Sequence, residues 1–203
     1  MERLVVFIGW LFIASMWLAG CGTLVLEDEK PSDPIEVVSF KGKWNNSTWD
    51  KALVDQIKES KLNTIVTKDA KDFGYNGQDL TIFYAKILVE MSKWESNYDP
   101  NTVYKESFGV LSTGLYQISI QSANYSKRGN CGFKNEAELK DPIKNIKCAV
   151  KIFTALVKER GDNSIAGKSV MKSWLGSSRY WSVLRGSRAY TAKALAAIKA
   201  ANK

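Results

Sequence analysis

The sequence predicts a mostly α-helical, single-domain protein, and three observations support this. The chain has 203 residues, and a typical domain has about 150, so one domain with a short appendage is expected. Apolar residues recur at three- and four-residue steps in several segments, whereas the alternation typical of strands never persists beyond a few residues. With 45% hydrophobic and 25% charged residues, the composition is that of a folded chain.

The first element is a predicted lipoprotein signal peptide, residues 1–20. A charged start precedes the apolar run Leu4–Leu18, which is shorter than the ~20 residues of a membrane span. Leu18-Ala19-Gly20-Cys21 resembles a bacterial lipobox, in which the cysteine thiol receives a diacylglycerol. The alternative is a plain secretory signal. Gly22 follows the cysteine, which resembles outer-membrane sorting, so we expect an anchor in a bacterial, outer membrane that faces the periplasm.

Residues 21–40 are predicted to be a lipidated N-terminus and tether, and residues 41–203 to be the folded domain. The tether contains an acidic run at 27–29 and two prolines, Pro31 and Pro34, without a clear period. The domain begins with a predicted helix at 47–60, which follows an N-cap pattern, and a turn-rich stretch at 61–79. Residues 80–96 give the strongest helical pattern, with an apolar stripe that indicates a buried face.

Residues 101–140 are predicted to be irregular, apart from a short apolar segment at 115–120. A second long helix is expected to start with Asp141 as N-cap and Pro142 at its first position, and to stop at Gly161. An aromatic and basic segment follows at 174–185, and an alanine-rich helix is expected at 189–201.

Cys131 and Cys148 are the two thiols that remain if Cys21 is lipidated. In an oxidising compartment outside the cytoplasm they are expected to form a disulfide. Two buried free thiols are the alternative.

Charge and histidine content narrow the function. The formal net charge of +8 favours anionic partners such as nucleic acid, acidic lipid or a cell-wall polymer. Predicted export argues against nucleic acid. The chain has no histidine, which excludes Ser-His-Asp and Cys-His nucleophile systems and His-ligated metals, and three cysteines are too few for a Cys₄ zinc site. We therefore expect neither metal nor cofactor, and an acid–base role for carboxylates, Lys, Tyr or Ser.

Glu95 is the candidate acid. It follows Met91 by four residues and Leu88 by seven, so it projects from the apolar stripe of its helix. It also sits in the last turn, where the helix dipole disfavours an anion. Both effects raise the pKa of a carboxyl group, as a catalytic acid requires. A solvent-exposed helix cap is the alternative.

Three motifs resemble the soluble lytic transglycosylase, or goose-type lysozyme-like, family. Residues 94–100, W-E-S-N-Y-D-P, resemble its E-S-x-F-x-P signature; residues 112–118, S-T-G-L-Y-Q-I, resemble its G-L-M-Q-I motif; residues 141–149, D-P-I-K-N-I-K-C-A, resemble its D-P-x-x-N-I-x-x-G motif. The resemblance covers residues from about 80 to 185, and extends more weakly to Trp44.

The resemblance implies a small lysozyme-like α domain with a cleft for peptidoglycan glycan strands. Members of this family cleave the β-1,4 bond between N-acetylmuramic acid and N-acetylglucosamine. The lytic transglycosylases do so with a single Glu, which Glu95 matches, and leave a 1,6-anhydro product.

The resemblance also implies the substrate-binding residues. Ser96 follows the acid, and the second motif supplies the cleft segment. Tyr116 stands where the family usually has Met, so it is expected either to stack on a sugar or to lie in the core. Asn145, of the third motif, is expected to support the fold. The implied binding residues are Ser96, Ser112, Gly114, Leu115, Tyr116, Gln117, Tyr104, Trp174 and Tyr180.

The fourth motif departs from the family pattern. Where A-Y-N-x-G is usual, the chain has Ser173-Trp174-Leu175-Gly176. Trp174 lacks the phenolic hydroxyl that hydrogen-bonds the catalytic Glu in the family, so Tyr180 or Tyr104 is expected to replace it. The departure leaves a lyase and a lysozyme-type hydrolase as alternatives. The hydrolase would need a second carboxylate such as Asp99 or Glu106 to activate water, unless one acid does both jobs. A non-catalytic peptidoglycan-binding lipoprotein is a separate alternative, against which the presence of Glu95 argues.

Overall fold

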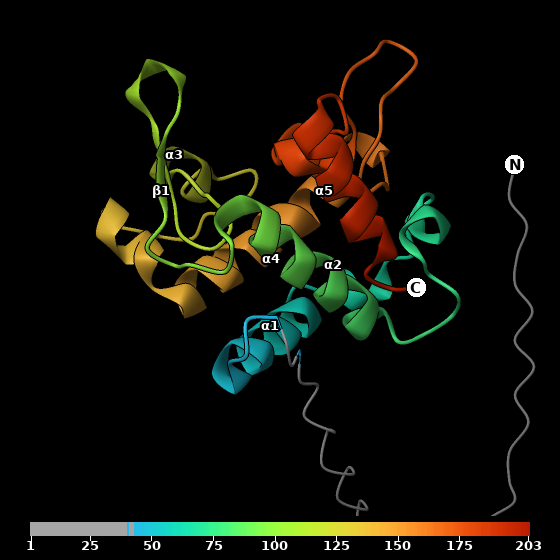
Figure 1. Ribbon diagram of the computed structural model, residues 1–203, viewed down its shortest axis with the longest axis horizontal. Coiled ribbons are helices and arrows are strands. Elements are labelled where there is room, and N and C mark those ends of the chain that lie inside the picture. Colours follow the sequence, from blue (N-terminus) through green and yellow to red (C-terminus); the bar gives the residue numbers. More distant parts are fainter. Residues whose placement is uncertain (1–39, 41–42) are drawn as a thin grey trace, which may run out of the picture. The chain divides into compact units, whose positions relative to one another are not determined.

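The computed structural model describes residue 40 and residues 43–203, which fold into five α-helices, short 3₁₀ turns and a two-stranded sheet (Figure 1). This confirms the mostly α-helical fold class. The described residues belong to one compact unit, residues 36–203. No helix in this described part is long and apolar enough to cross a membrane. The predicted signal peptide, the predicted lipidation site Cys21 and most of the predicted tether lie outside the described residues.

The two N-terminal helices start at side-chain caps. Helix α1, Ser47–Glu59, follows Asn46, whose side chain accepts hydrogen bonds from two backbone N–H groups of the first turn. Helix α2, Leu80–Ser96, follows Asp79, which caps it in the same way. It ends at Asn97, whose left-handed φ of 53° is incompatible with a further helical turn.

Helix α4, Pro142–Lys158, begins as the sequence predicts, with the Asp141 side chain capping its first turn and Pro142 at its first position. It ends before the expected Gly161, because Glu159 takes an extended conformation with ψ of 131°. Arg160, with a left-handed φ of 59°, follows within the 3₁₀ turn Glu159–Gly161. Helix α5, Ala189–Ala200, closes the chain.

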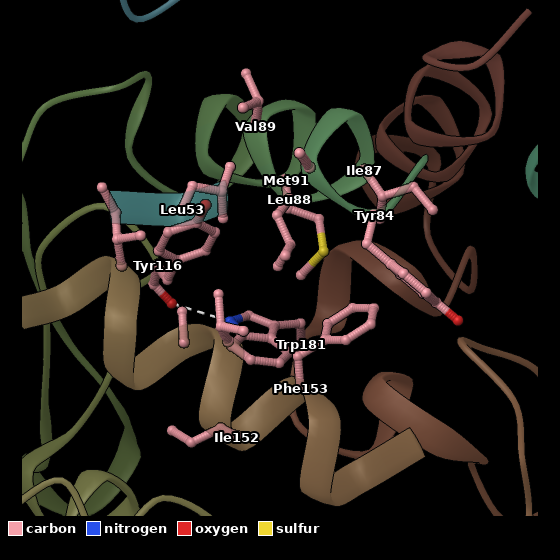
Figure 2. Packing of buried hydrophobic residues seen from close by; sticks show 14 of the residues in the cluster. Leu53, Tyr84, Ile87, Leu88, Val89, Met91, Tyr116, Ile152, Phe153 and Trp181 are labelled. Atoms are coloured by element: carbon pink, nitrogen blue, oxygen red, sulfur yellow. Dashed lines mark hydrogen bonds between the residues drawn. The ribbon is translucent and has the colours of Figure 1, made fainter. Parts of the chain in front are cut away.

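Helix α2 is central, with residues buried on most of its sides, and it contacts both α1 and α5. Figure 2 shows Leu88 and Met91 of α2 packed toward Phe153 of α4 and Trp181. The indole N–H of Trp181 donates to the carbonyl of Tyr116 at 3.0 Å, which ties the C-terminal segment to the centre of the core (Figure 2).

The prediction that residues 101–140 are irregular is wrong in part. Strands β1, Val103–Lys105, and β2, Leu111–Thr113, form an antiparallel hairpin in which Tyr104 pairs with Ser112. The hairpin projects from the helices (Figure 1). Strands of three residues are too short to produce a visible alternation. A four-residue helix, α3, Ile120–Ala123, follows, and the segment 174–185 forms two 3₁₀ turns, Gly176–Arg179 and Ser182–Leu184.

The structure contains the Cys131–Cys148 disulfide that the cysteine count predicts. It joins the loop after α3 to α4. The side chain of Asn124 also holds this loop, since it donates to the Phe133 carbonyl at 2.7 Å and accepts from the Phe133 N–H at 2.9 Å. Closing a loop of this length is worth ~3 kcal/mol in the chain-entropy picture.

Candidate active site

Glu95 lies in the last turn of α2, and the chain around it is fixed. The N–H of Asn97 donates to the Lys93 carbonyl at 2.8 Å, and both Asn97 and Tyr98 take left-handed backbone conformations that turn the chain away. The Ser96 hydroxyl donates to the Leu115 carbonyl at 3.0 Å, which joins the end of α2 to the segment after the hairpin.

A cavity of about 340 Å³ opens beside Glu95. It is bounded by the end of α2, the hairpin, the segment through α3, and the turns near the C-terminal helix. Its lining residues are Glu95, Glu106, Val110, Ser112, Gln117, Ser119, Ser122, Tyr180, Trp181, Ser182 and Arg185.

The Glu95 carboxyl is largely desolvated. Its Oε1 atom is buried, and no described residue donates a hydrogen bond to it. Burial raises the pKa of Glu95 to about 8; the negative charge of Glu106 adds to this rise, and the Arg185 guanidinium opposes it. At neutral pH the carboxyl therefore carries a proton that it can donate.

Glu106 is a second carboxylate in the same cavity. It lies in the hairpin between β1 and β2, and it accepts a hydrogen bond from the buried Ser112 hydroxyl at 3.0 Å. Glu106 was a candidate second carboxylate from the sequence, but its spacing from Glu95 could not show whether it lies across the cleft. The hairpin, which folds β2 back on β1, brings Glu106 to the same pocket as Glu95.

Arg185 is the cation of the site. Its Nε donates to the Ser178 carbonyl at 2.8 Å and its Nη2 to the Arg179 carbonyl at 2.9 Å. Its guanidinium carbon lies 5.7 Å from the ring centroid of Trp174. Its Nη2 also donates to the Tyr180 carbonyl at 3.4 Å. Three carbonyls and one ring therefore hold Arg185 at the cavity wall.

Three of the predicted binding residues line the cavity: Ser112, Gln117 and Tyr180. The Gln117 amide donates to the carbonyls of Thr102 and Gly114 at 3.1 and 2.8 Å, while its Oε1 is buried without a partner among the described residues. The Tyr180 hydroxyl accepts from the Ser119 N–H at 3.3 Å. Tyr180 thus lies in the cavity without the expected hydrogen bond to Glu95.

Four other residues assigned to substrate binding lie inside the fold instead. Leu115 and Tyr116 are completely buried in the core and do not line the cavity, so Tyr116 takes the core alternative. Ser96 is buried, and its hydroxyl bonds backbone carbonyls. Gly114, with φ of +85°, lies so close to Asn145 that an added Cβ would be 2.4 Å from the amide nitrogen. Its missing side chain makes room for Asn145.

Asn145 has the supporting role expected of it. It is completely buried, accepts from the Tyr116 N–H at 3.0 Å, and donates to the carbonyls of Thr113 and Leu139 at 3.1 and 2.9 Å. These bonds fix the segment that leads to Gln117.

Tyr104 and Trp174 also lie away from the cavity lining. Tyr104 is largely exposed on β1, opposite Ser112. Trp174 sits between two cations, with Lys168 4.5 Å from its ring centroid and Arg185 beyond 5 Å. Trp174 therefore contacts the site through Arg185.

Sequence reasoning missed Ser119, Ser122, Ser182 and Arg185. Small hydroxyl residues in irregular segments carry no periodic signal. The aromatic and basic composition of 174–185 was the one available indication of Arg185.

Comparisons with known proteins relate this chain to one family. The family profile described as "Transglycosylase SLT domain" matches residues 84–183. Three solved structures of Bd0314 DslA are similar at 30% sequence identity, and each comparison covers 75% of this chain and 88% of the other. The chain belongs to the SLT family. A search among curated proteins gives no match.

The DslA structures also match in fold. The wild-type form 2 has a TM-score of 0.64, and two mutants, each with one Glu replaced by Gln, have TM-scores of 0.66 and 0.62. The SLT match includes most of α2 with Glu95, the hairpin with Glu106 and all of α4. It thus spans both carboxylates of the cavity.

Proposed function

We propose that this protein is a murein lytic transglycosylase that cleaves the β-1,4 bond between N-acetylmuramic acid and N-acetylglucosamine in peptidoglycan strands. The observation that carries the proposal is the Glu95 carboxyl, whose buried Oε1 has no partner among the described residues and whose pKa is about 8. Membership of the SLT family supports peptidoglycan as the substrate.

In the proposed reaction Glu95 acts first as acid and then as base. Its carboxyl proton passes to the glycosidic oxygen as the bond from that oxygen to C1 of the muramic acid breaks. The resulting carboxylate then takes the proton of the 6-hydroxyl while O6 bonds to C1. The products are a new 4-hydroxyl end and a 1,6-anhydromuramic end, and no water is consumed.

The remaining polar groups of the cavity suit a sugar. The unpartnered Oε1 of Gln117 offers an acceptor to a hydroxyl or acetamido N–H, and the hydroxyls of Ser119 and Ser122 line the same cavity. A buried acceptor without a partner is costly, so a substrate donor that fills it gains binding. We therefore assign sugar binding to Gln117 and these serines.

A lysozyme-type hydrolase is the second candidate, and Glu106 is the observation that favours it. A carboxylate in the same cavity can take a proton from water as the water oxygen bonds to C1. The two DslA mutants each replace one glutamate, and these two glutamates have the same sequence separation as Glu95 and Glu106. This match supports a role for both carboxylates.

Mass spectrometry of the digestion products decides between these functions. Residues 36–203 are incubated with purified peptidoglycan, with Glu95→Gln as the matched control. We expect 1,6-anhydromuramic ends from the wild type and none from Glu95→Gln. Reducing muramic ends would establish the hydrolase. Binding without any soluble product would identify a non-catalytic peptidoglycan-binding protein.

We further propose that residues 1–20 are removed and that Cys21 is lipidated. The lipid would anchor the domain to the bacterial outer membrane, on the side that faces the periplasm. The lipobox-like sequence before Cys21 supports this. Cell fractionation of the Cys21→Ala variant is expected to give an unprocessed or soluble protein. A mature variant that stays in the membrane fraction would refute the anchor.

A further inference from the structure

The positive charge of the chain is concentrated at its C-terminal end. Residues 163–203 contain no Asp or Glu, so their eight basic residues account for the whole net charge of +8. Among the described residues, Arg179 is the one member of this group that pairs with acids, Glu159 and Asp162. The eight are Lys168, Lys172, Arg179, Arg185, Arg188, Lys193, Lys199 and Lys203.

Within this basic region the loop 167–175 exposes two adjacent apolar side chains. Val170 is 100% exposed and Met171 is 84% exposed, and Lys168 and Lys172 flank them. Figure 1 shows this loop, in orange, projecting away from the helices. Single exposed apolar residues are ordinary, whereas an apolar pair at the tip of a projecting loop is a feature of binding surfaces.

The loop is held in shape by its own backbone. The Ser169 N–H donates to the Ser173 carbonyl at 2.8 Å, and the Leu175 N–H donates to the Gly167 carbonyl at 3.0 Å. Lys168 also lies over the Trp174 ring at 4.5 Å. These contacts hold the base of the loop, so Val170 and Met171 are presented at a fixed tip. A fixed tip loses less conformational entropy when these two side chains bind a partner.

We propose that the loop 167–175 is a docking surface for an anionic phospholipid membrane. Val170 and Met171 enter the boundary between headgroups and acyl chains, while Lys168 and Lys172 bind the lipid phosphates. A lipid surface is the partner that satisfies both features, because glycan strands and soluble polyanions offer no apolar phase for the tip. The charge of residues 163–203 is complementary to such a surface.

Docking at this loop places the catalytic cavity beside the membrane. Trp174 at the base of the loop lies against Arg185, and Arg185 lines the cavity. A docked domain would therefore meet the peptidoglycan that lies next to the lipid surface. The docking itself does not depend on catalysis, so its test does not depend on the proposed function.

The test measures cosedimentation of residues 36–203, which lack the lipidation site, with vesicles. One set contains phosphatidylcholine and phosphatidylglycerol in equal parts, and the other contains phosphatidylcholine alone. We expect binding to the anionic vesicles only. The tip variant Val170→Ser/Met171→Ser and the charge variant Lys168→Ser/Lys172→Ser are each expected to lower the partition coefficient by about tenfold or more.

Two control variants match these changes elsewhere on the surface. Val66→Ser replaces another exposed valine, and Lys71→Ser/Lys127→Ser removes the same charge from other exposed positions. Both are expected to bind within about twofold of the wild type. Failure of the wild type to bind, equal binding to both vesicles, wild-type binding by the tip variant, or an equal loss in the controls would each overturn the proposal.

Discussion

Helix α2 carries two glutamates that differ in their partners: Glu90 is buried, and Glu95 is half-buried with a buried Oε1 atom. Glu90 is 6% exposed, and both of its oxygens are bonded: Oε2 to the Lys43 ammonium at 2.6 Å and Oε1 to the Trp94 indole N–H at 3.2 Å. Glu95, about one and a half turns later, has a buried Oε1 that no described residue bonds, and its pKa is about 8.

The difference shows how one residue type serves stability or chemistry according to its surroundings. Each residue advances the helix by about 100°, so five residues place the two side chains on different faces. Glu90 faces the segment that precedes α1, where a cation and an indole N–H compensate its charge. Glu95 faces the cavity, where burial without compensation keeps the proton on the carboxyl. Variants of these two residues and of their neighbours test this contrast.

The largest effect is expected for Glu95→Gln. Glutamine keeps the shape and polarity of the side chain but has no transferable proton, so release of soluble peptidoglycan fragments is expected to fall by ~10²-fold or more. The assay is the turbidity loss of purified peptidoglycan, with mass spectrometry of the products. Wild-type activity in this variant would reject the proposed mechanism.

Glu95→Gln is also expected to alter how stability depends on pH. The folded pKa of about 8 lies above the unfolded value near 4.5, so the stability from the protonated carboxyl is fully present below pH 4.5 and is lost as pH rises through 8. The variant lacks this loss. We therefore expect the free energy of unfolding of the wild type, measured in urea, to fall relative to that of the variant by a few kcal/mol from pH 4 to pH 8.

Glu90→Ala is expected to have the opposite effect to Glu95→Gln: it lowers the stability of the fold and leaves peptidoglycan cleavage nearly unchanged. It removes the buried acceptor of Lys43 and Trp94, which we expect to cost about 2 kcal/mol, because Lys43 is partly exposed and solvent takes over its charge. Urea denaturation gives this value. Lys51→Ala, which breaks the exposed Lys51–Asp55 pair, is the control and is expected to cost under ~0.5 kcal/mol. Equal costs for the two variants would contradict the role of Glu90.

Glu106→Gln is expected to shift the pH profile of the reaction. The negative charge of Glu106 contributes to the raised pKa of Glu95, so its removal lowers that pKa and moves the alkaline limb of kcat to lower pH. Ser112→Ala, which removes the hydroxyl bond but keeps the charge, is the control. An unchanged limb would refute the electrostatic coupling. A loss of ~10²-fold at the pH optimum would favour the hydrolase.

The smallest effect is expected for Asp99→Asn. Asp99 accepts from the Asn101 N–H at 2.9 Å and from the Thr102 hydroxyl at 3.3 Å, so it stabilises the turn after α2 and does not line the cavity. Activity is expected to stay within about threefold of the wild type, as for an ordinary surface change. A loss as large as that of Glu95→Gln would make Asp99 a catalytic partner.

The helices and the acid could be predicted from the sequence because their signals are local. The apolar stripe and the caps Asp79 and Asp141 define α2 and α4 within single segments, and Glu95 follows from its place on that stripe. The disulfide followed from counting thiols.

The opposite wall of the cavity could not be predicted because it depends on contacts between distant segments. Glu106 reaches the cavity through a hairpin whose strands are too short to show a pattern, and Arg185 is positioned by carbonyls and by Trp174. Within the motif segment 112–118, Ser112, Gly114, Leu115 and Gln117 were predicted to bind substrate, and Tyr116 was predicted either to stack on a sugar or to lie in the core. The residues of this segment alternate, however, between core and cavity: Tyr116 faces inward and Gln117 faces the site.

Carbon-13 NMR of the Glu95 side-chain carboxyl, followed from pH 4 to pH 10, measures whether this group holds its proton at neutral pH. The resonance is assigned by its absence from the spectrum of Glu95→Gln. We predict a titration midpoint near 8, because burial without a partner disfavours the charged form. A midpoint near 4.5, the value of an ordinary glutamate, would contradict the assignment of Glu95 as the general acid.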